Sequence, residues 1–407
     1  MKQFEGFRVQ MYPSPEQEKQ LLGYCEASRY SYNWALGKFN EIYEETGKWV
    51  SSNELCKIFT HHRTNDEGDT WDWLRSFNAA PLRIIVRSVK KQFLITSKSR
   101  SKHRSTKINF PKFMKKKEKR YHFFVRKECL RIFDDYISFE GFNRKNHNTI
   151  SIGIHNIPHD KMYNYCDPHI KREPDGTWWF SCLVKHEEPI ETNESWLITE
   201  PIGIDLGIKT FVTTSSGDKF NYPKKKITKL KRQMKRKERR LTKMQKKMID
   251  KSIRTKTKYE DIPKSKNMQK LEKKVFKSKR HIANIRRNVR YEIANTLIKR
   301  NPRAIVMEGL NVTGMVKNHP IATKLADLGF YEMKKVLKYK CKWNDIEFVE
   351  ADRWFPSSKK CSCCGTIKKD LKLSDRVYKC PVCGLEMDRD LNAAINLKHL
   401  ANIDILS

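Results

Sequence analysis

Residues 202–207 read Ile202-Gly203-Ile204-Asp205-Leu206-Gly207, an apolar run interrupted by one acid. This pattern predicts a buried strand, and residues 211–214 predict a second strand that returns as a hairpin. A carboxylate inside an apolar strand is unfavourable unless it is paired or bound to a metal. Asp205 is therefore a candidate for chemistry, although it could also be a satisfied polar group at a strand end.

Two further acids stand out by their positions. Residues 304–308 predict a buried strand that ends on Glu308, and Asp390 opens a helix that carries Leu391, Ala394, Ile395 and Leu397. Three such acids, if brought together, would repel one another unless divalent cations held them. That arrangement is typical of a two-metal nuclease, in which Mg²⁺ ions about 3.5–4 Å apart bind the attacking and leaving oxygens. Alternatively, Asp390 or Asp388 is only a helix N-terminal charge.

Four of the eleven cysteines form two knuckles. Cys361 and Cys364 belong to a C-x-x-C-G run, and Cys380 and Cys383 belong to a C-P-x-C-G run. This spacing predicts a closed tetrahedral zinc site, which is structural because it leaves no open coordination position. Cys363 does not fit the knuckle spacing. The other six are scattered singly, as is typical of reduced cysteines in a cytosolic protein: Cys25, Cys56, Cys129, Cys166, Cys182 and Cys341.

The charge of the chain indicates a polyanionic partner. Over 407 residues, 84 Lys+Arg against 47 Asp+Glu give a formal net charge of +37. Nucleic acid is the default partner, because each Lys or Arg that meets a phosphate releases a counterion. The charge is bunched, which disfavours a generally basic surface, and the basic helices carry few of the anchors that a membrane surface needs.

Neither a membrane span nor a secretory signal is predicted. No stretch approaches the ~20 consecutive apolar residues of a membrane helix, and the first residues lack an apolar run. We therefore expect a soluble intracellular protein.

Residues 1–190 predict a β-rich domain with helices inserted into it. A strand at 4–12 precedes a capping box at Ser14-Pro15-Glu16-Gln17, where a helix begins that runs on past Phe39. A second helix is predicted at 80–95, and a basic loop that lies along phosphate at about 97–120. Residues 121–188 alternate with a period of two and include the hairpin signal Pro174-Asp175-Gly176. A small β-barrel or sheet with a helical part at about 14–120 is expected.

Residues 191–407 predict a second domain that contains a long basic helical pair at about 224–300. Apolar residues at heptad spacing, from Ile227 to Met248 and from Met268 to Ile293, predict that the two helices pack together. The rest of the first helix is almost entirely Lys and Arg, which favours a nucleic-acid face. A helix at about 321–343, a strand at 346–351 and a zinc ribbon at about 358–387 follow. The connection at 249–267 has no predicted role.

Four motifs together resemble the TnpB family of small bacterial insertion sequences, the apparent ancestor of miniature type V CRISPR effectors. The resemblance covers essentially all of residues 200–400, and residues 12–33 resemble the family's first helix more loosely. The matching runs are Gly203-Ile204-Asp205-Leu206-Gly207, Glu308-Gly309-Leu310-Asn311-Val312, Asp352-Arg353-Trp354-Phe355-Pro356-Ser357-Ser358-Lys359 and Asp388-Arg389-Asp390-Leu391-Asn392-Ala393-Ala394-Ile395-Asn396.

This resemblance implies an α/β plus α+β fold class. A RuvC-like nuclease domain of RNase H fold, split by insertions and holding the zinc ribbon, would follow a wedge β-barrel with a helical recognition insertion. The resemblance also implies that Asp205, Glu308 and Asp390 are catalytic and bind Mg²⁺. Asp390 is preferred because the family's acid stands two residues before an Asn, here Asn392, and Asp388 is the fallback.

TnpB proteins bind a guide RNA from the transposon end and cut double-stranded DNA beside a short adjacent motif. We expect guide RNA and double-stranded target DNA as partners, Mg²⁺ and Zn²⁺ as cofactors, and a monomer bound to RNA. The resemblance also implies a bacterial or archaeal cytoplasm, with association with the nucleoid when the protein is bound to DNA. A miniature type V CRISPR effector and a non-cleaving RNA-guided regulator of transposition stay open as alternatives. Retention of all three acids favours cleavage, and a DNA-strand transferase is disfavoured because a separate protein carries the family's transposition chemistry. The guide, the adjacent motif, the cleavage pattern and the oligomeric state stay open.

Overall fold

The computed structural model describes residues 3–101, 110–115, 121–133, 135–140, 149–154, 165–186, 199–310, 314–315, 319–372 and 375–401. The chain divides into two compact units. The first comprises residues 1–187 and 247–273, and the second comprises residues 188–246 and 274–407. No helix among the described residues is long and apolar enough to cross a bilayer.

The first unit contains a seven-stranded sheet that must be curled. Its strand order is β2-β6-β7-β1-β5-β4-β3, with antiparallel pairs throughout. Six strand spacings would put β2 and β3 about 29 Å apart in a flat sheet. Residues 125–129, which join β2 to β3, reach at most about 22 Å. The strands are β1 Gln3–Tyr12, β2 His122–Phe124, β3 Leu130–Ile132, β4 Tyr136–Glu140, β5 Thr149–Ile154, β6 Tyr165–Arg172 and β7 Trp178–His186.

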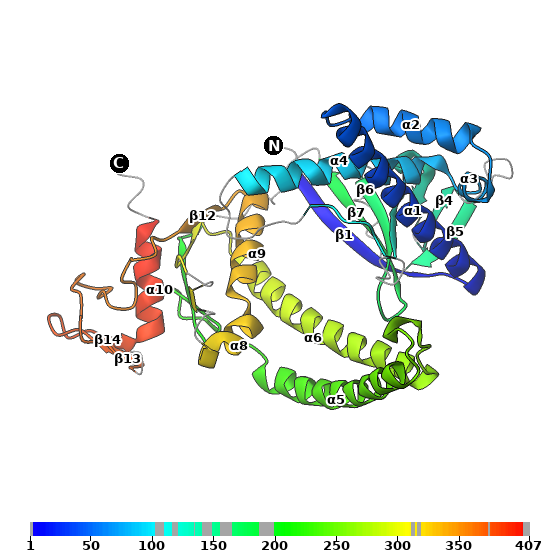
Figure 1. Ribbon diagram of the computed structural model, residues 1–407. Helices are drawn as coiled ribbons and strands as arrows, with labels where there is room; N and C mark the ends of the chain where they lie inside the picture. Colours follow the sequence, from blue (N-terminus) through cyan, green and yellow to red (C-terminus); the bar gives the residue numbers. More distant parts are fainter. Residues whose placement is uncertain are drawn as a thin grey trace. The chain divides into compact units, whose positions relative to one another are not determined.

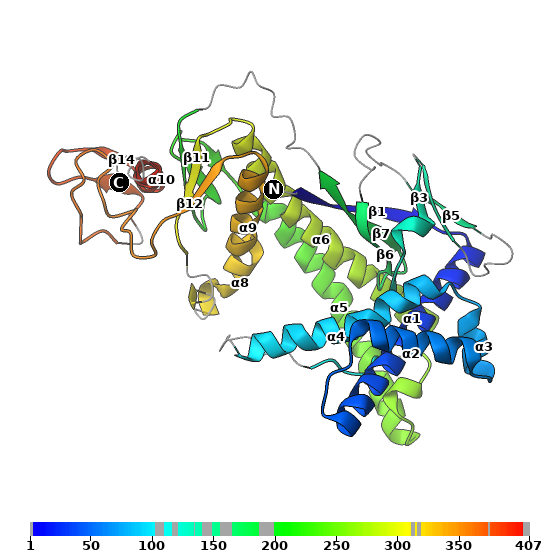
Figure 2. The same cartoon turned by 90° about the horizontal axis from the view of Figure 1, so that it is seen from above.

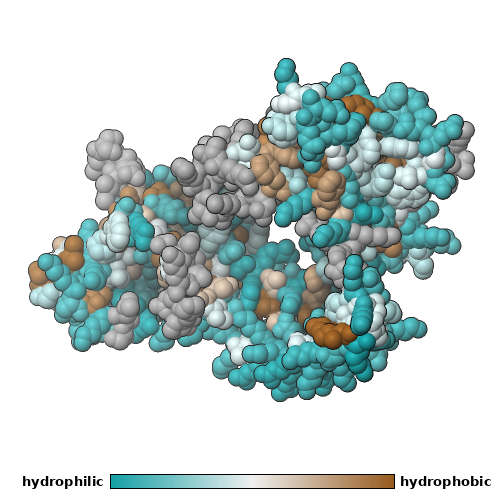
Figure 3. Space-filling view, in the orientation of Figure 1, coloured by the Kyte–Doolittle hydropathy of each residue, from teal (hydrophilic) through white to brown (hydrophobic). Residues whose placement is uncertain are grey.

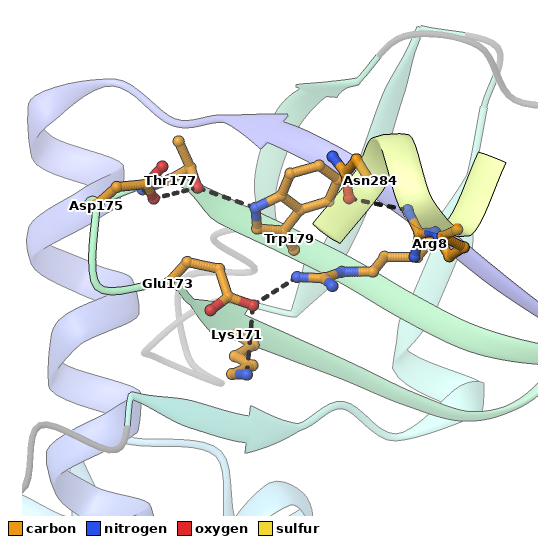
Figure 4. Close-up of polar contacts among 8 residues, drawn as sticks. Arg8, Lys171, Glu173, Asp175, Thr177, Trp179 and Asn284 are labelled. Atoms are coloured by element: carbon orange, nitrogen blue, oxygen red, sulfur yellow. Dashed lines mark hydrogen bonds and ion pairs between the residues drawn. The ribbon is translucent and has the colours of Figure 1, made fainter. Parts of the chain in front are cut away.

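Side-chain contacts agree with this curl. The hydroxyl of Tyr165, in β6, donates to the carbonyl oxygen of Leu130, in β3, at 2.6 Å. On the sheet surface, Arg8 donates to Glu173 at 2.6 Å and its guanidinium carbon lies 4.5 Å from the centroid of the Trp179 ring (Figure 4). The predicted hairpin between β6 and β7 is confirmed, and Gly176 takes a φ of +88° there. Closure of the curled sheet into a barrel stays a prediction.

Four helices lie between β1 and β2 in the chain and gather on one side of the sheet (Figure 1). The predicted capping box is confirmed, because Ser14 and Gln17 exchange side-chain and backbone hydrogen bonds. The basic loop predicted from residue 97 is wrong up to residue 101, because the last helix continues to Ser101. Residues 102–109 and 116–120 of that loop lie outside the described residues. The helices are α1 Pro15–Thr46, α2 Ser52–Asn65, α3 Asp69–Arg75 and α4 Ala79–Ser101.

The second unit is built on a five-stranded mixed sheet with the order β10-β9-β8-β11-β12. The β8 strand runs antiparallel to β9 and parallel to β11, which in turn runs parallel to β12. The carboxyl ends of β8, β11 and β12 therefore meet at one edge of the sheet. The strands are β8 Ile202–Leu206, β9 Val212–Thr214, β10 Lys219–Phe220, β11 Ala304–Met307 and β12 Glu347–Glu350.

Helices cover both faces of this sheet, so β11 is apolar throughout. Ile305 and Met307 belong to the core that α6 (Lys266–Ile298) and α9 (Phe330–Trp343) share. Ala304 and Val306 alternate with them and pack on the other face with α10 (Arg389–Leu400). Figure 2 shows the sheet between α9 and α10. The single helix predicted at 321–343 is wrong, because α8 (His319–Leu328) ends before Gly329, which takes a φ of +66°.

Helix α10 packs directly on the backbone of β8 at Gly203. A Cβ atom at Gly203 would lie 1.9 Å from the carbonyl oxygen of Ala394. We expect Gly203→Ala to lower the free energy of unfolding by about 3 kcal/mol or more, because the strand and the helix would have to separate. Urea denaturation measures this, and Gly6→Ala is the control because nothing lies within 4 Å of that Cβ position. Equal effects of the two substitutions would contradict the packing described.

The long basic helices are confirmed as α5 (Lys224–Arg254) and α6. Part of the predicted apolar seam is buried, at Ile227, Met268, Val275, Ile282 and Ile293. The connection between the helices is shorter than predicted, since α5 extends to Arg254 and α6 begins at Lys266, with a 3₁₀ turn at Tyr259–Asp261 between them. The face over α5 that Figure 3 shows is largely hydrophilic.

Candidate functional site

The register of two parallel strands brings Asp205 and Glu308 to the same edge of the sheet. Met307 pairs with Ile204, so the residues that follow on β11 and β8 are Glu308 and Asp205. Because side chains alternate along a strand, and Ile204 and Met307 face the core on the α6 and α9 side, both acids lie toward α10.

Helix α10 brings Asp390 to the same place. Ala394 lies against Gly203, and Asp390 is one helical turn before Ala394. A turn advances ~5.4 Å, close to the ~6.6 Å between Gly203 and Asp205 along the strand. Accordingly, one carboxylate oxygen of Asp390 would lie 3.9 Å from a Cβ atom at Gly207. The structure thus gathers the three acids that the sequence singled out.

The three acids form a partly buried anionic centre. Burial and then the nearby carboxylates of Asp390 and Glu308 raise the pKa of Asp205 to about 8. Burial also raises the pKa of Glu308. Arg389 opposes this trend, and its guanidinium lies 3.5 Å from the Asp390 carboxylate. Carboxylates that neighbour one another in a partly buried site favour either a shared proton or a bound cation.

Asp388, the alternative to Asp390, caps a helix and pairs with a lysine. One of its carboxylate oxygens accepts hydrogen bonds from the backbone N–H groups of Asp390 and Leu391, at 2.9 and 3.1 Å, and so caps α10. The other oxygen lies 2.8 Å from the Lys219 ammonium. Burial alone would raise the pKa of Asp388, but the Lys219 ammonium and the two N–H groups outweigh it, so that the pKa is lowered. These contacts favour Asp390 over Asp388 as the acid that is available to a ligand.

The four knuckle cysteines converge on one point. The sulfur atoms of Cys361, Cys364, Cys380 and Cys383 all lie within 4.8 Å of one another. Two of these separations are 3.6 Å and 3.5 Å, close to the ~3.8 Å that a tetrahedral zinc with ~2.3 Å bonds imposes. The set could therefore hold a structural metal. In the described ranges no other group of three or more His, Cys, Asp or Glu residues converges in this way.

Two asparagines that sequence analysis used only as markers join the first knuckle to α10. The Asn392 amide nitrogen donates to the Lys360 carbonyl oxygen at 2.7 Å, and its oxygen accepts from the Ser362 N–H at 3.0 Å. The amide of Asn396 donates to the carbonyl oxygens of Ser357 and Lys360. Both asparagines are buried, at 0% and 2% exposure. The sequence feature that could have predicted this role is their spacing of four residues, which puts the two amides on one helix face.

We expect Asn396→Asp to lower the free energy of unfolding by about 2–3 kcal/mol. The substitution keeps the shape of the side chain but leaves the Ser357 and Lys360 carbonyl oxygens facing a buried carboxylate. Urea denaturation tests this, with Asn284→Asp on α6 as a more exposed control. A loss no larger than that of the control would contradict a clamping role for Asn396.

Two basic grooves accompany these centres, one in each unit. In the second unit, the first half of α5 lines a groove with Lys224, Lys225, Lys229, Arg232 and Arg236. In the first unit, Arg83 and Arg87 of α4 line a groove with Arg126 and Lys127. The second groove was not predicted. The sequence feature that could have predicted this groove is the spacing of Arg83 and Arg87, which puts both on one face of a helix.

Three family models match parts of this chain. Family models described as a helix-turn-helix domain, a "Probable transposase" of the OrfB type of IS605, and a Cas12f1-like TNB domain match residues 1–48, 181–319 and 330–397. The first span holds the strand β1 and one continuous helix in this structure.

Two curated relatives align with nearly the whole chain. A Streptomyces pristinaespiralis protein with the provisional name RNA-guided DNA endonuclease is 28% identical over 96% of this chain and 88% of its own length. The relative InsQ of Escherichia coli, with the same provisional name, is 24% identical over 98% of this chain and 92% of its own. A solved structure of the mini-RNA-guided endonuclease CRISPR-Cas_phi3 covers 98% of this chain and 92% of its own at 9% identity. Its TM-score of 0.47 is too low to support an argument.

The fold and the site define a mixed α/β protein with a carboxylate centre beside a four-cysteine ribbon. Through these matches the chain resembles the TnpB family.

Proposed function

We propose that this protein is an RNA-guided DNA endonuclease of an insertion sequence, which cuts double-stranded DNA next to a short adjacent motif. The observation that carries the proposal is the meeting of Asp205, Glu308 and Asp390 at one sheet edge. The net charge of +37 supports nucleic-acid partners, and the names of the relatives support RNA guidance and a DNA substrate. The protein would act in the cytoplasm, on DNA.

The carboxylate centre suits Mg²⁺. Its donors are three carboxylates, which are hard oxygen ligands, and burial together with the neighbouring carboxylates of Asp390 and Glu308 raises the pKa of Asp205. When bound, Mg²⁺ would supply the Lewis acid that activates water and stabilises the leaving oxygen. The chain itself would contribute the ligands Asp205, Glu308 and Asp390, which Asp388 and Lys219 help to place by fixing the start of α10.

The ribbon suits Zn²⁺. Four thiolates with sulfur separations of 3.6 Å and 3.5 Å match a closed tetrahedral site, so this metal would be structural. The ribbon would fix the first two turns of α10 through Asn392 and Asn396, and so would support the carboxylate of Asp390 in the first of them.

The basic grooves would bind phosphates. In the proposed complex, pairing between guide RNA and target strand supplies sequence specificity, and the protein holds the paired strands by their backbones. The face of α5 would be one such surface, and the Arg83 and Arg87 groove would be another. Residues 1–190 would serve as the wedge and recognition part that reads the adjacent motif, and residues 191–407 as the nuclease part of RNase H fold.

We expect the stability of the metal-free protein to fall as the pH rises from about 4 to about 8. Asp205 has a pKa of about 8 in the folded chain and about 3.9 when unfolded, so over this window the folded state binds more protons. Mg²⁺ competes with that proton, so it should raise the melting temperature more at pH 8 than at pH 6. Scanning calorimetry with Asp205→Asn as the reference measures both trends. A Mg²⁺ shift that is independent of pH and of Asp205 would contradict the metal assignment.

Sequencing the RNA that purifies with the protein tests the proposed partner. RNA that maps to the downstream flank of its own gene supports an insertion-sequence endonuclease, and RNA from a repeat array supports the CRISPR alternative. Absence of any defined RNA, with the basic grooves bound to random cellular fragments, would overturn RNA guidance.

A further inference from the structure

The loop that follows β12 carries an aromatic side chain that the fold does not use. Trp354 is 79% exposed, the largest value among the large hydrophobic side chains in the described residues. Its neighbour Phe355 packs instead against the small core between the sheet and α10. Singly exposed apolar residues are common, so exposure alone does not indicate a ligand, and what matters is where this indole lies and what accompanies it.

Two hydrogen bonds fix the backbone of the turn that carries this indole. The carboxylate of Asp352 accepts from the Trp354 backbone N–H at 2.7 Å, and the Phe355 N–H donates to the Asp352 carbonyl oxygen at 3.1 Å. The guanidinium carbon of Arg353, which is also exposed, lies 5.0 Å from the centroid of the Trp354 ring. A rigid turn therefore presents one flat aromatic ring and one cation together.

This turn lies beside the carboxylate centre. The Ala351 N–H donates to the Met307 carbonyl oxygen at 2.9 Å, so the chain leaves β12 at the edge where β11 ends. The backbone nitrogen of Arg353 lies 3.4 Å from the position of a Cβ atom at Gly309, the residue after Glu308. A phosphodiester placed at the carboxylates would thus have the Arg353–Trp354 turn at its side.

We propose that this turn holds the DNA strand that is being cut: the Trp354 indole stacks on a nucleobase next to the scissile phosphate, and Arg353 contacts a neighbouring phosphate. The inference rests on the proposed function and names two positioning residues for it. Stacking on an aromatic ring suits a single strand of any sequence, because every base has an exposed π face there. DNA is favoured over guide RNA because the turn adjoins the acids and does not line the basic groove of α5 in the same unit.

Abasic substitution in the DNA tests the stacking directly. The full-length protein with its own RNA is given matched target DNA in which one nucleotide at a time, on either side of the cut, lacks its base. We expect Trp354→Ala to lower the cleavage rate about tenfold, Trp354→Phe to keep most of it and Trp354→Leu to resemble Ala. At one position, the wild type should cut the abasic DNA as slowly as Trp354→Ala cuts intact DNA. Trp354→Ala should cut that abasic DNA no more slowly than it cuts intact DNA. If the loss from the missing base and the loss from Trp354→Ala multiplied at every position, the proposal would be overturned.

A second measurement does not depend on cleavage. In the Asp205→Ala background, a single-stranded oligonucleotide carrying 2-aminopurine should lose fluorescence on binding, and Trp354→Ala should restore it. Tyr339→Ala, at another partly exposed aromatic ring of the same unit, is the control and should leave the quenching unchanged. Quenching without any cleavage by the wild type would contradict the proposed function and keep the stacking site. Cleavage with unaltered quenching, or an effect confined to guide-RNA affinity, would overturn the stacking site and keep the proposed function.

Discussion

Replacing Asp205 with Ala is expected to abolish DNA cleavage, with a loss of about 10³-fold or more, while the chain still folds and binds RNA. Asp205 is the acid that both neighbouring carboxylates face, so its removal takes a ligand from the centre of the site. The chain should still fold, because the substitution removes a buried carboxyl group whose pKa is raised to about 8. Gel assays of cleavage and filter binding of RNA measure the two effects.

Asp388→Asn is the matched control for that experiment. Asp388 lies two residues before Asp390 but is engaged in capping α10 and in pairing with Lys219. We expect this change to reduce stability by about 1 kcal/mol and to leave most of the cleavage intact. Cleavage that survives Asp390→Asn but is lost in Asp388→Asn would show that the two acids have been assigned the wrong way round.

Replacing Cys380 with Ser is expected to release the ribbon metal and to unfold the ribbon. The sulfur of Cys380 lies 3.5 Å from that of Cys364 inside the four-cysteine set, and structural zinc contributes roughly 10–16 kcal/mol of binding free energy in small domains. Metal analysis of the purified protein should show one equivalent of zinc lost. Because Asn392 and Asn396 join the ribbon to α10, cleavage should fall as well.

Cys363→Ser is the control within the same knuckle. Cys363 is exposed and lies outside the converging set, so this variant should keep its zinc and its activity. If Cys363→Ser lost the metal as Cys380→Ser does, the ligand set would have to be revised.

The acids could be found in the sequence because each one breaks a pattern. Asp205 interrupts an apolar strand and Glu308 ends another, and such positions are unfavourable without a partner. The register that brings them side by side could not be found in this way, because it depends on how β8 and β11 align in three dimensions. The same holds for Gly203, whose missing Cβ atom lets α10 reach the strand.

Helix boundaries were predicted less well than strands. Residues 321–343 have an apolar pattern that suits one helix, and Gly329 breaks it through a left-handed conformation that the pattern does not record. Residues 97–101 were predicted as a loop because they are polar, yet Lys and Arg favour a helix where the preceding turns already form one. In both places, local geometry outweighed the periodicity of apolar residues.

Cleavage of a guide-matched DNA duplex tests the central claim most directly. The protein is purified with its RNA, the guide segment is sequenced, and a duplex that contains the matching sequence beside a randomised flank is incubated with Mg²⁺. We predict cuts that require the match, a defined flank, Mg²⁺ and Asp205. Cutting that ignores the match, or persists in Asp205→Ala, would contradict RNA-guided cleavage at this carboxylate centre.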